Sequence, residues 1–81
     1  MQHSGSFTKY SGQRLNSAPM QVLNGMMRMD CTSACLQLGT CYHVNYNTVE
    51  LTCELLSEEN WSEIDVIGSS DWLFLAEQES D

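Results

Sequence analysis

The sequence predicts a small α+β domain in which one short α-helix packs on a β-sheet and disulfides fasten the two together. Three observations favour this fold. The chain has 81 residues, and a domain of this size buries only about 60% of its unfolded surface, so cross-links are expected. All four cysteines lie between Cys31 and Cys53. A helical period starts at Cys31 and gives way to the two-residue period of strands after Cys41.

The first third of the chain predicts three short strands. The first covers residues 7–10 and ends at the turn pair Ser11-Gly12. Two more cover residues 13–16 and 20–23. The last of these ends at Asn24-Gly25, a pair typical of tight turns.

The middle of the chain predicts a helix of about two turns. Asp30 is placed to cap it or to lie in its first turn, where a negative charge meets the helix dipole favourably. One apolar stripe then follows the spacing i, i+3, i+4 and i+7, at Cys31, Ala34, Cys35 and Leu38. Gly39 ends the helix. A helix this short is not stable alone in water, so other parts of the domain must hold it in place.

Strands are expected on both sides of a turn at Asn47-Thr48. Before it, Tyr42, Val44 and Tyr46 face one way and Cys41, His43 and Asn45 face the other. After it, Leu51, Cys53 and Leu55 alternate with Glu50, Thr52 and Glu54. This second pattern predicts an amphipathic strand with its acidic side chains toward water.

The last part of the chain predicts a polar loop at residues 57–60, a turn at residues 68–71 and a final buried strand at residues 72–76, with Trp72 in the core. We expect the domain to span residues 7–76. Residues 1–6 are predicted to be a disordered leader, and residues 77–81 an acidic, frayed tail.

Charge excludes several classes of partner. The formal charge is -8; Lys9, Arg14 and Arg28 are the only cations, and all eleven acidic residues lie from Asp30 onward. Three cations cannot form the basic stripe that binding to nucleic acid requires. The longest apolar run, residues 72–76, is far too short to cross a bilayer, so no direct membrane insertion is expected.

The density of cysteines indicates an oxidising compartment. Four cysteines in a chain of 81 residues are typical of secreted domains held by disulfides. The first six residues have neither the charged nor the apolar region of a signal peptide. We therefore expect an extracellular module that is part of a larger, multidomain protein, either secreted or anchored to a membrane.

The spacing of the cysteines favours disulfides over a metal site or a redox centre. The gaps between them are three, five and eleven residues, whereas structural zinc sites use two pairs of closely spaced ligands. The Cys-x-x-Cys motif of redox centres is absent from the sequence. A small zinc-binding domain is the weaker alternative. We expect no metal and no cofactor.

Four cysteines permit three pairings. A bridge from Cys31 to Cys35 would stay within a single helical turn. A nested arrangement, with Cys35–Cys41 inside Cys31–Cys53, would fasten both ends of the helix to the strands that follow. Its outer bridge would close a loop of about 22 residues, which is worth roughly 3 kcal/mol in the chain-entropy estimate.

The order of these motifs resembles the PAN/apple modules. The similar features are "GQRL", the Asp30-Cys31-x-x-x-Cys35 helix, "CYHVNYN", "CELL" and the late "DWLFL". The resemblance covers nearly the whole chain and is closest to the four-cysteine PAN form, because no further pair of cysteines ties the termini. It implies one short helix packed on a curved antiparallel sheet and the nested pairs Cys31–Cys53 and Cys35–Cys41. It also implies a non-catalytic recognition unit for protein or carbohydrate.

An enzymatic function is not expected. His43 shares a predicted strand face with Cys41 and Asn45, which suggests a Cys-His-Asn group. A disulfide at Cys41 would remove the nucleophile, however. We therefore interpret His43 as a surface or half-buried residue without a catalytic role.

The sequence thus predicts an extracellular adhesion or recognition module, and it leaves two kinds of ligand open. A protein partner would use exposed aromatic anchors and an acidic rim. A lectin-like module for neutral glycans is the alternative, with an aromatic platform and amide hydrogen bonds. The candidate ligand-binding residues for either are Tyr42, His43, Asn45 and Trp61. Asn60 is a candidate glycosylation site, because Asn60-Trp61-Ser62 is the only sequon.

Overall fold

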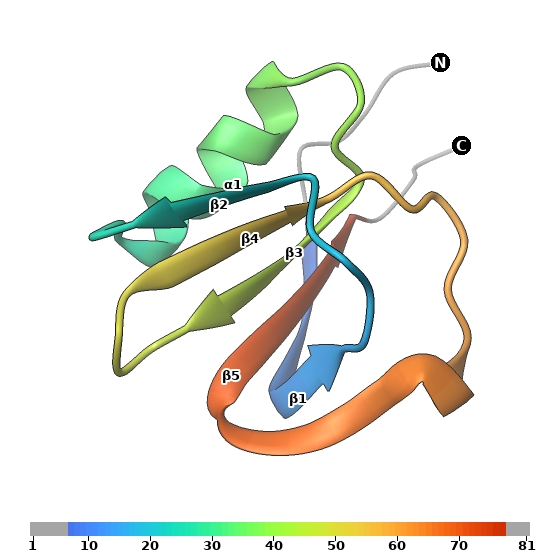
Figure 1. Cartoon of the computed structure of the whole chain (residues 1–81). Coiled ribbons are helices and arrows are strands. Elements are labelled where there is room, and N and C mark those ends of the chain that lie inside the picture. Colours follow the sequence, from blue (N-terminus) through green and yellow to red (C-terminus); the bar gives the residue numbers. More distant parts are fainter. Residues whose placement is uncertain (1–6, 78–81) are drawn as a thin grey trace.

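The computed structural model describes residues 7–77 as an antiparallel sheet of five strands with one α-helix packed on it (Figure 1). The elements are β1 (Phe7–Leu15), β2 (Gln21–Asn24), α1 (Arg28–Gln37), β3 (His43–Asn47), β4 (Thr52–Leu56), the 3-10 helix η1 (Glu63–Asp65) and β5 (Val66–Glu77). The strand order is β1-β5-β3-β4-β2, so β1 and β2 are the edges. The predicted α+β fold, a disulfide-linked sheet with one helix, is confirmed.

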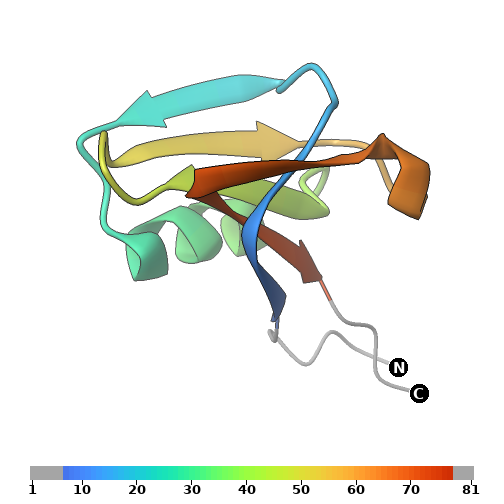
Figure 2. The same cartoon turned by 90° about the horizontal axis from the view of Figure 1, so that it is seen from below.

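Two predicted turns lie inside continuous strands, so those predictions were wrong. The register of β1 with β5 shifts between Ser11 and Gln13, where Gly12 has a φ of 71° and stands opposite residues 69–72, so the extra residues lie on β5. On β5, residues 68–71 are part of the strand, and Gly68 pairs with Gln13 beyond the bulge. A bulge of this kind, with a positive-φ glycine at the same place, can bend a pair of strands without ending either of them. Figures 1 and 2 show the result, in which the first half of β5 bends away from β3 toward η1.

Two disulfides fasten α1 to the sheet. Cys31–Cys53 joins the helix to β4, and Cys35–Cys41 joins it to the segment before β3. This is the pairing that the family resemblance implies. The Cα atoms are 5.6 and 5.1 Å apart, within the usual range for disulfides. Asp30 lies in the first turn of α1, where the sequence placed it, although the helix begins earlier, at Arg28.

Both faces of the sheet are covered. On the α1 side, the disulfides pack with Val44, Tyr46, Leu55 and Leu75. On the opposite side, a second cluster contains Leu15, Leu56, Phe74 and Ala76, with Tyr10, Trp61 and Val66 packed against it. The central strand β3 is therefore buried at all five positions.

The second cluster overturns the prediction that Glu54 faces water. Its side chain lies on the face opposite α1, is 8% exposed and accepts two hydrogen bonds from the Arg14 guanidinium, at 2.9 and 3.0 Å. The same guanidinium lies 4.7 Å from the ring centre of Trp72. Trp72, predicted to be in the core, is half-buried beneath this cation.

Within residues 7–77, no helix is long and apolar enough to cross a membrane.

Candidate functional site

Asn45, one of the four predicted ligand-binding residues, is fully buried and serves the sheet. Its side-chain oxygen accepts a hydrogen bond from the Leu15 backbone N–H at 2.9 Å. Its side-chain nitrogen donates to the Leu15 carbonyl at 2.9 Å and to Glu54 Oε1 at 3.2 Å. Because each polar atom of the amide is engaged, Asn45 links β3 to β1 and has no free group for a ligand.

His43 is also buried, with 4% of its surface exposed, so the prediction of a surface or half-buried residue was wrong. Its Nδ1 accepts a hydrogen bond from the backbone N–H of Glu77 at 3.0 Å, and its Nε2 lies 3.1 Å from the carbonyl oxygen of Glu59. These partners assign the neutral tautomer with its proton on Nε2, which donates to Glu59. The side chain therefore fastens the loop after β4 to the end of β5. Cys41 is held in a disulfide, so it provides no thiolate to His43.

The other two candidates are more accessible. Tyr42 is half-buried beside His43, with its ring centre 6.4 Å from the imidazole. Trp61 is half-buried on the opposite side of the sheet from α1, and one wall of a groove is formed by its ring. Of the four candidates, Trp61 alone lines this groove.

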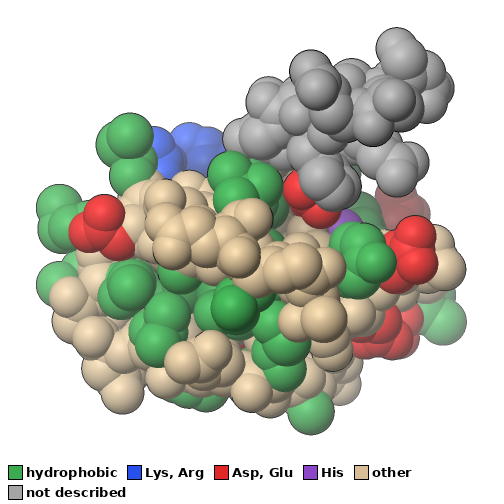
Figure 3. Space-filling model, turned by 90° about the horizontal axis from the view of Figure 1, so that it is seen from above, with side chains coloured by type: hydrophobic (Ala, Val, Ile, Leu, Met, Phe, Trp, Pro, Cys, Tyr) green, Lys and Arg blue, Asp and Glu red, His purple; other side chains and the backbone are tan. Residues whose placement is uncertain are grey.

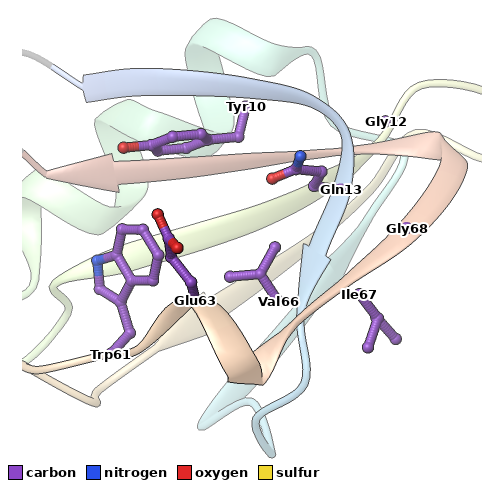
Figure 4. Close-up of a pocket in the computed structure, with 8 residues that line it drawn as sticks. All are labelled: Tyr10, Gly12, Gln13, Trp61, Glu63, Val66, Ile67 and Gly68. Atoms are coloured by element: carbon purple, nitrogen blue, oxygen red, sulfur yellow. The ribbon is translucent and has the colours of Figure 1, made fainter.

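The groove has a volume of about 450 Å³ and lies between β1, η1 and the first half of β5. Its lining residues are Tyr10, Gly12, Gln13, Trp61, Glu63, Val66, Ile67 and Gly68. In Figure 4 the Glu63 carboxylate and the Gln13 amide extend toward the space beside the Tyr10 and Trp61 rings, whereas Ile67 points away. We call this feature the Trp61 groove.

Buried Phe74 fixes the two aromatic rings of the Trp61 groove. The Trp61 ring meets Phe74 edge-on with centres 4.9 Å apart, and the Tyr10 ring stacks on Phe74 at 5.7 Å. Tyr10 and Trp61 also contact each other edge-on at 5.6 Å. Such ring pairs restrict side-chain rotation. The aromatic walls are therefore formed before any ligand arrives.

The polar groups of the groove are not engaged with the described protein. Within residues 7–77, no hydrogen bond or ion pair involves the side chains of Tyr10, Gln13, Trp61 or Glu63. The side chains of Asn45 and His43, in contrast, are fully engaged within the fold. Unpartnered groups that share one groove are available to a ligand.

The charge around the groove is negative. The segment 57–65 carries four exposed carboxylates and no cation, namely Glu58, Glu59, Glu63 and Asp65. The cations lie elsewhere. Arg14 pairs with Glu54, while Lys9 and Arg28 line a cleft beside α1. Figure 3, which looks onto α1, shows the Lys and Arg side chains together at one edge of that face.

A second, more apolar groove lies at the start of α1. It is lined by Met27, Arg28, Met29, Tyr46, Thr48, Leu51 and Leu73 and has a volume of about 380 Å³. Met27 and Met29 are exposed. This groove offers few polar groups to orient a ligand, since the Tyr46 hydroxyl already donates to the Met26 carbonyl.

Over the described part of the chain, no group of three or more His, Cys, Asp or Glu side chains is arranged to hold a metal ion.

The sequence singled out Trp61 but missed Tyr10, Gln13 and Glu63. Tyr10 and Trp61 are separated by 51 positions, and the two rings meet because both pack on Phe74 of β5. The single signal available was the aromatic residue just before the Ser11-Gly12 pair, which was interpreted as the end of a strand.

A family model described as PAN domain matches residues 5–77. Among curated proteins, none matches the chain.

Proposed function

Since this chain belongs to the PAN domain family, whose modules bind protein or carbohydrate, we propose that it is a non-catalytic, extracellular recognition module that binds a protein partner. The observation that carries the proposal is the Trp61 groove, in which rigid aromatic walls and unpartnered polar groups face solvent. Binding sites of this kind combine an apolar anchor with a few orienting polar groups.

A protein partner fits the surroundings of the groove. Aromatic side chains are frequent hot spots in protein interfaces, and the Tyr10 and Trp61 rings are held at low entropic cost by Phe74. The exposed carboxylates of segment 57–65 form a charged rim. Rim charges of one sign steer a complementary partner and disfavour others.

The extracellular part of the proposal is supported by the disulfides. The two bridges join α1 to the sheet, and no cysteine in the described part of the chain is free. Disulfides of this kind persist in oxidising compartments. We place the module in a larger, multidomain secreted or membrane-anchored protein.

The test is a binding screen against a panel of purified secreted proteins and receptor ectodomains from the same organism. We expect at least one partner whose affinity falls about tenfold or more in Trp61→Ala, as for a hot-spot residue. The control is Val49→Ala, since Val49 is exposed in the turn between β3 and β4 and lies outside the groove. Equal loss in the two variants, or no binding partner at all, would contradict the proposal.

A neutral glycan is the alternative ligand, and one specific observation favours it. Two aromatic rings and the Gln13 amide line the groove together. The rings could pack against a sugar ring while the amide forms hydrogen bonds with its hydroxyl groups. A glycan array probed with the wild-type module and with Trp61→Ala checks this alternative. Binding of an uncharged glycan that depends on Trp61 would favour it over a protein ligand.

We extend the proposal to glycosylation at Asn60. The residue is exposed in the loop after β4 and starts the sequon Asn60-Trp61-Ser62. Secretion from a eukaryotic host should therefore add a glycan next to the Trp61 groove. Glycosidase treatment should lower the mass of the wild-type module and leave that of Asn60→Gln unchanged; an unchanged wild-type mass would show that the site is not used.

A further inference from the structure

The chemistry of the Trp61 groove indicates which part of a partner enters it. We propose that the groove takes a cationic side chain, lysine or arginine, from the partner protein, with the Tyr10 and Trp61 rings as walls and the Glu63 carboxylate as counter-ion. This inference rests on the proposed recognition function and names the chemical group that the same site binds.

The first argument is the combination of groups in the groove. A cation is attracted to the face of an aromatic ring when it lies within about 6 Å of the ring centre, and tryptophan is the strongest partner. Tyr10 and Trp61 line the cavity together with Glu63, whose carboxylate can also accept charge-assisted hydrogen bonds from an ammonium or guanidinium group. The Gln13 amide oxygen adds one more acceptor in the same groove.

The second argument is that the protein already binds a cation in this way within its own fold. The Arg14 guanidinium lies 4.7 Å from the ring centre of Trp72 and donates to both carboxylate oxygens of Glu54. That site therefore pairs one tryptophan with one glutamate around an arginine. The Trp61 groove contains the same pair of residue types, Trp61 and Glu63, without a cation from the described part of the chain.

The third argument is the distribution of charge. The rim carries Glu58, Glu59 and Asp65 in addition to Glu63, and all four are exposed. The described cations cannot neutralise this rim, because Arg14 is engaged with Glu54 and because Lys9 and Arg28 line a different cleft, beside α1. The rim would attract a basic partner, whereas its charge contributes nothing to the binding of an uncharged sugar.

The groove is large enough for the cationic side chain and for the residues that flank it in the partner sequence. Its volume of about 450 Å³ exceeds that of a single lysine or arginine side chain. The remaining space lies beside β1 and the first half of β5, and it would hold residues that flank the cation in the partner sequence. The ligand is therefore a short basic segment, not an isolated charge.

The experiment is an NMR titration of the isotope-labelled module at physiological salt. The probes are a pentapeptide with one central lysine, its arginine and norleucine analogues, and N-acetylglucosamine. The indole N–H signal of Trp61 reports on the groove that this residue lines. The signal of Trp72 is the internal control, because the ring of Trp72 is already in contact with the Arg14 guanidinium. We expect the lysine and arginine peptides to shift the Trp61 signal saturably, with no shift from norleucine and no change at Trp72.

Two charge variants distinguish a specific contact with the Glu63 carboxylate from a general effect of the negative charge of the chain. Glu63→Gln should weaken binding of the lysine peptide by about threefold or more, in line with the loss of one charge-assisted contact. Glu50→Gln removes the same charge from an exposed position in the β3–β4 turn and should change the affinity less. Both variants must retain the wild-type spectrum outside the site.

Several outcomes would overturn the inference. These are an equal response to norleucine and lysine, an equal loss in Glu63→Gln and Glu50→Gln, or no shift of the Trp61 signal with any probe. A response to N-acetylglucosamine alone would identify the groove as a glycan site and leave the recognition function standing. The recognition function itself fails only if the protein panel and the glycan array also show no binding.

Discussion

Asn45 shows how one polar side chain can replace a strand-to-strand contact. Its amide donates to and accepts from the backbone of Leu15, as a peptide group in an adjacent strand would, although 30 positions separate the two residues. Buried amides with every polar atom engaged specify a single arrangement of the surrounding strands. The role of this residue is therefore to hold β1 against β3 at the point where β1 ends.

Asn45→Asp should destabilise the domain by about 3 kcal/mol. The new carboxylate cannot donate to the Leu15 carbonyl, and it would lie next to the Glu54 carboxylate in a buried position. Urea unfolding followed by fluorescence measures the change in the free energy of unfolding. Asn16→Asp, at an exposed position, is the matched control and should change it by less than about 0.5 kcal/mol.

Gly12 controls the path of β1 and therefore the shape of the Trp61 groove. Its φ of 71° belongs to the left-handed region, and a Cβ atom added there would meet nothing within 4 Å. The only penalty for a side chain at this position is the backbone conformation itself.

Gly12→Ala should cost about 1–2 kcal/mol in unfolding free energy, the typical penalty for alanine in the left-handed region. Gly68→Ala is the matched control, because Gly68 lies on the opposite strand with equal free space but no positive φ. It should be neutral or slightly stabilising. Thermal melting of both variants gives the comparison, and equal loss in both would show that the bulge carries no strain.

The disulfides differ in what they contribute to the helix. Cys31–Cys53 spans 22 positions and joins α1 to β4, whereas Cys35–Cys41 spans only 6. In the chain-entropy model the outer bridge is worth about 3 kcal/mol and the inner one about 2 kcal/mol. Burial of the sulfur atoms adds a packing contribution to both.

Replacing Cys31 and Cys53 with alanine should therefore lower the stability more than replacing Cys35 and Cys41. We expect the outer-bridge variant to lose most of its cooperative melting, since a small domain has only a few kcal/mol to lose. Calorimetry of the two double variants checks this order. A cooperative transition near the wild-type temperature after removal of Cys31–Cys53 would refute the structural role of that bridge.

Local sequence patterns predicted some elements correctly. The features that they predicted wrongly or missed depend on contacts between residues that are distant in the sequence. The apolar spacing predicted the buried face of α1 at Cys31 and Cys35, because helix period is a local property. The same stripe wrongly included Leu38, which follows the helix and is exposed. The alternation around Glu54 predicted the wrong environment, since the second face of the sheet is covered by β1 and Trp61, which no local pattern reveals. The same limit applies to the groove. Trp61 could be proposed from its residue type, but its contact with Tyr10 depends on the pairing of β1 with β5, in which Tyr10 lies opposite Phe74.

The excess of acidic residues should make the stability of the whole domain depend on salt. The formal charge is -8, and the ion pair among residues 7–77 joins Arg14 to Glu54 in a partly buried position that salt screens weakly. Repulsion among exposed carboxylates is screened more strongly.

Raising sodium chloride from about 10 to about 150 mM should therefore raise the melting temperature by a few degrees, because the Debye length falls from about 30 to about 8 Å. The double variant Glu59→Gln, Asp65→Asn removes two exposed charges and should show a smaller salt effect. A fall in melting temperature with salt would mean that attraction, not repulsion, dominates the surface.

The pairing of Phe7 with Glu77 has a mechanical consequence. The two ends of the described domain lie side by side on neighbouring antiparallel strands, and the register continues from there to Ser11 and Leu73. Tension that pulls these ends apart would load the hydrogen bonds between β1 and β5 one after another, as in a zipper, instead of all at once in shear. The bridge between α1 and β4 lies outside that path. A weak pull would thus peel β1 away and open the Trp61 groove, while the disulfide-linked remainder stays intact.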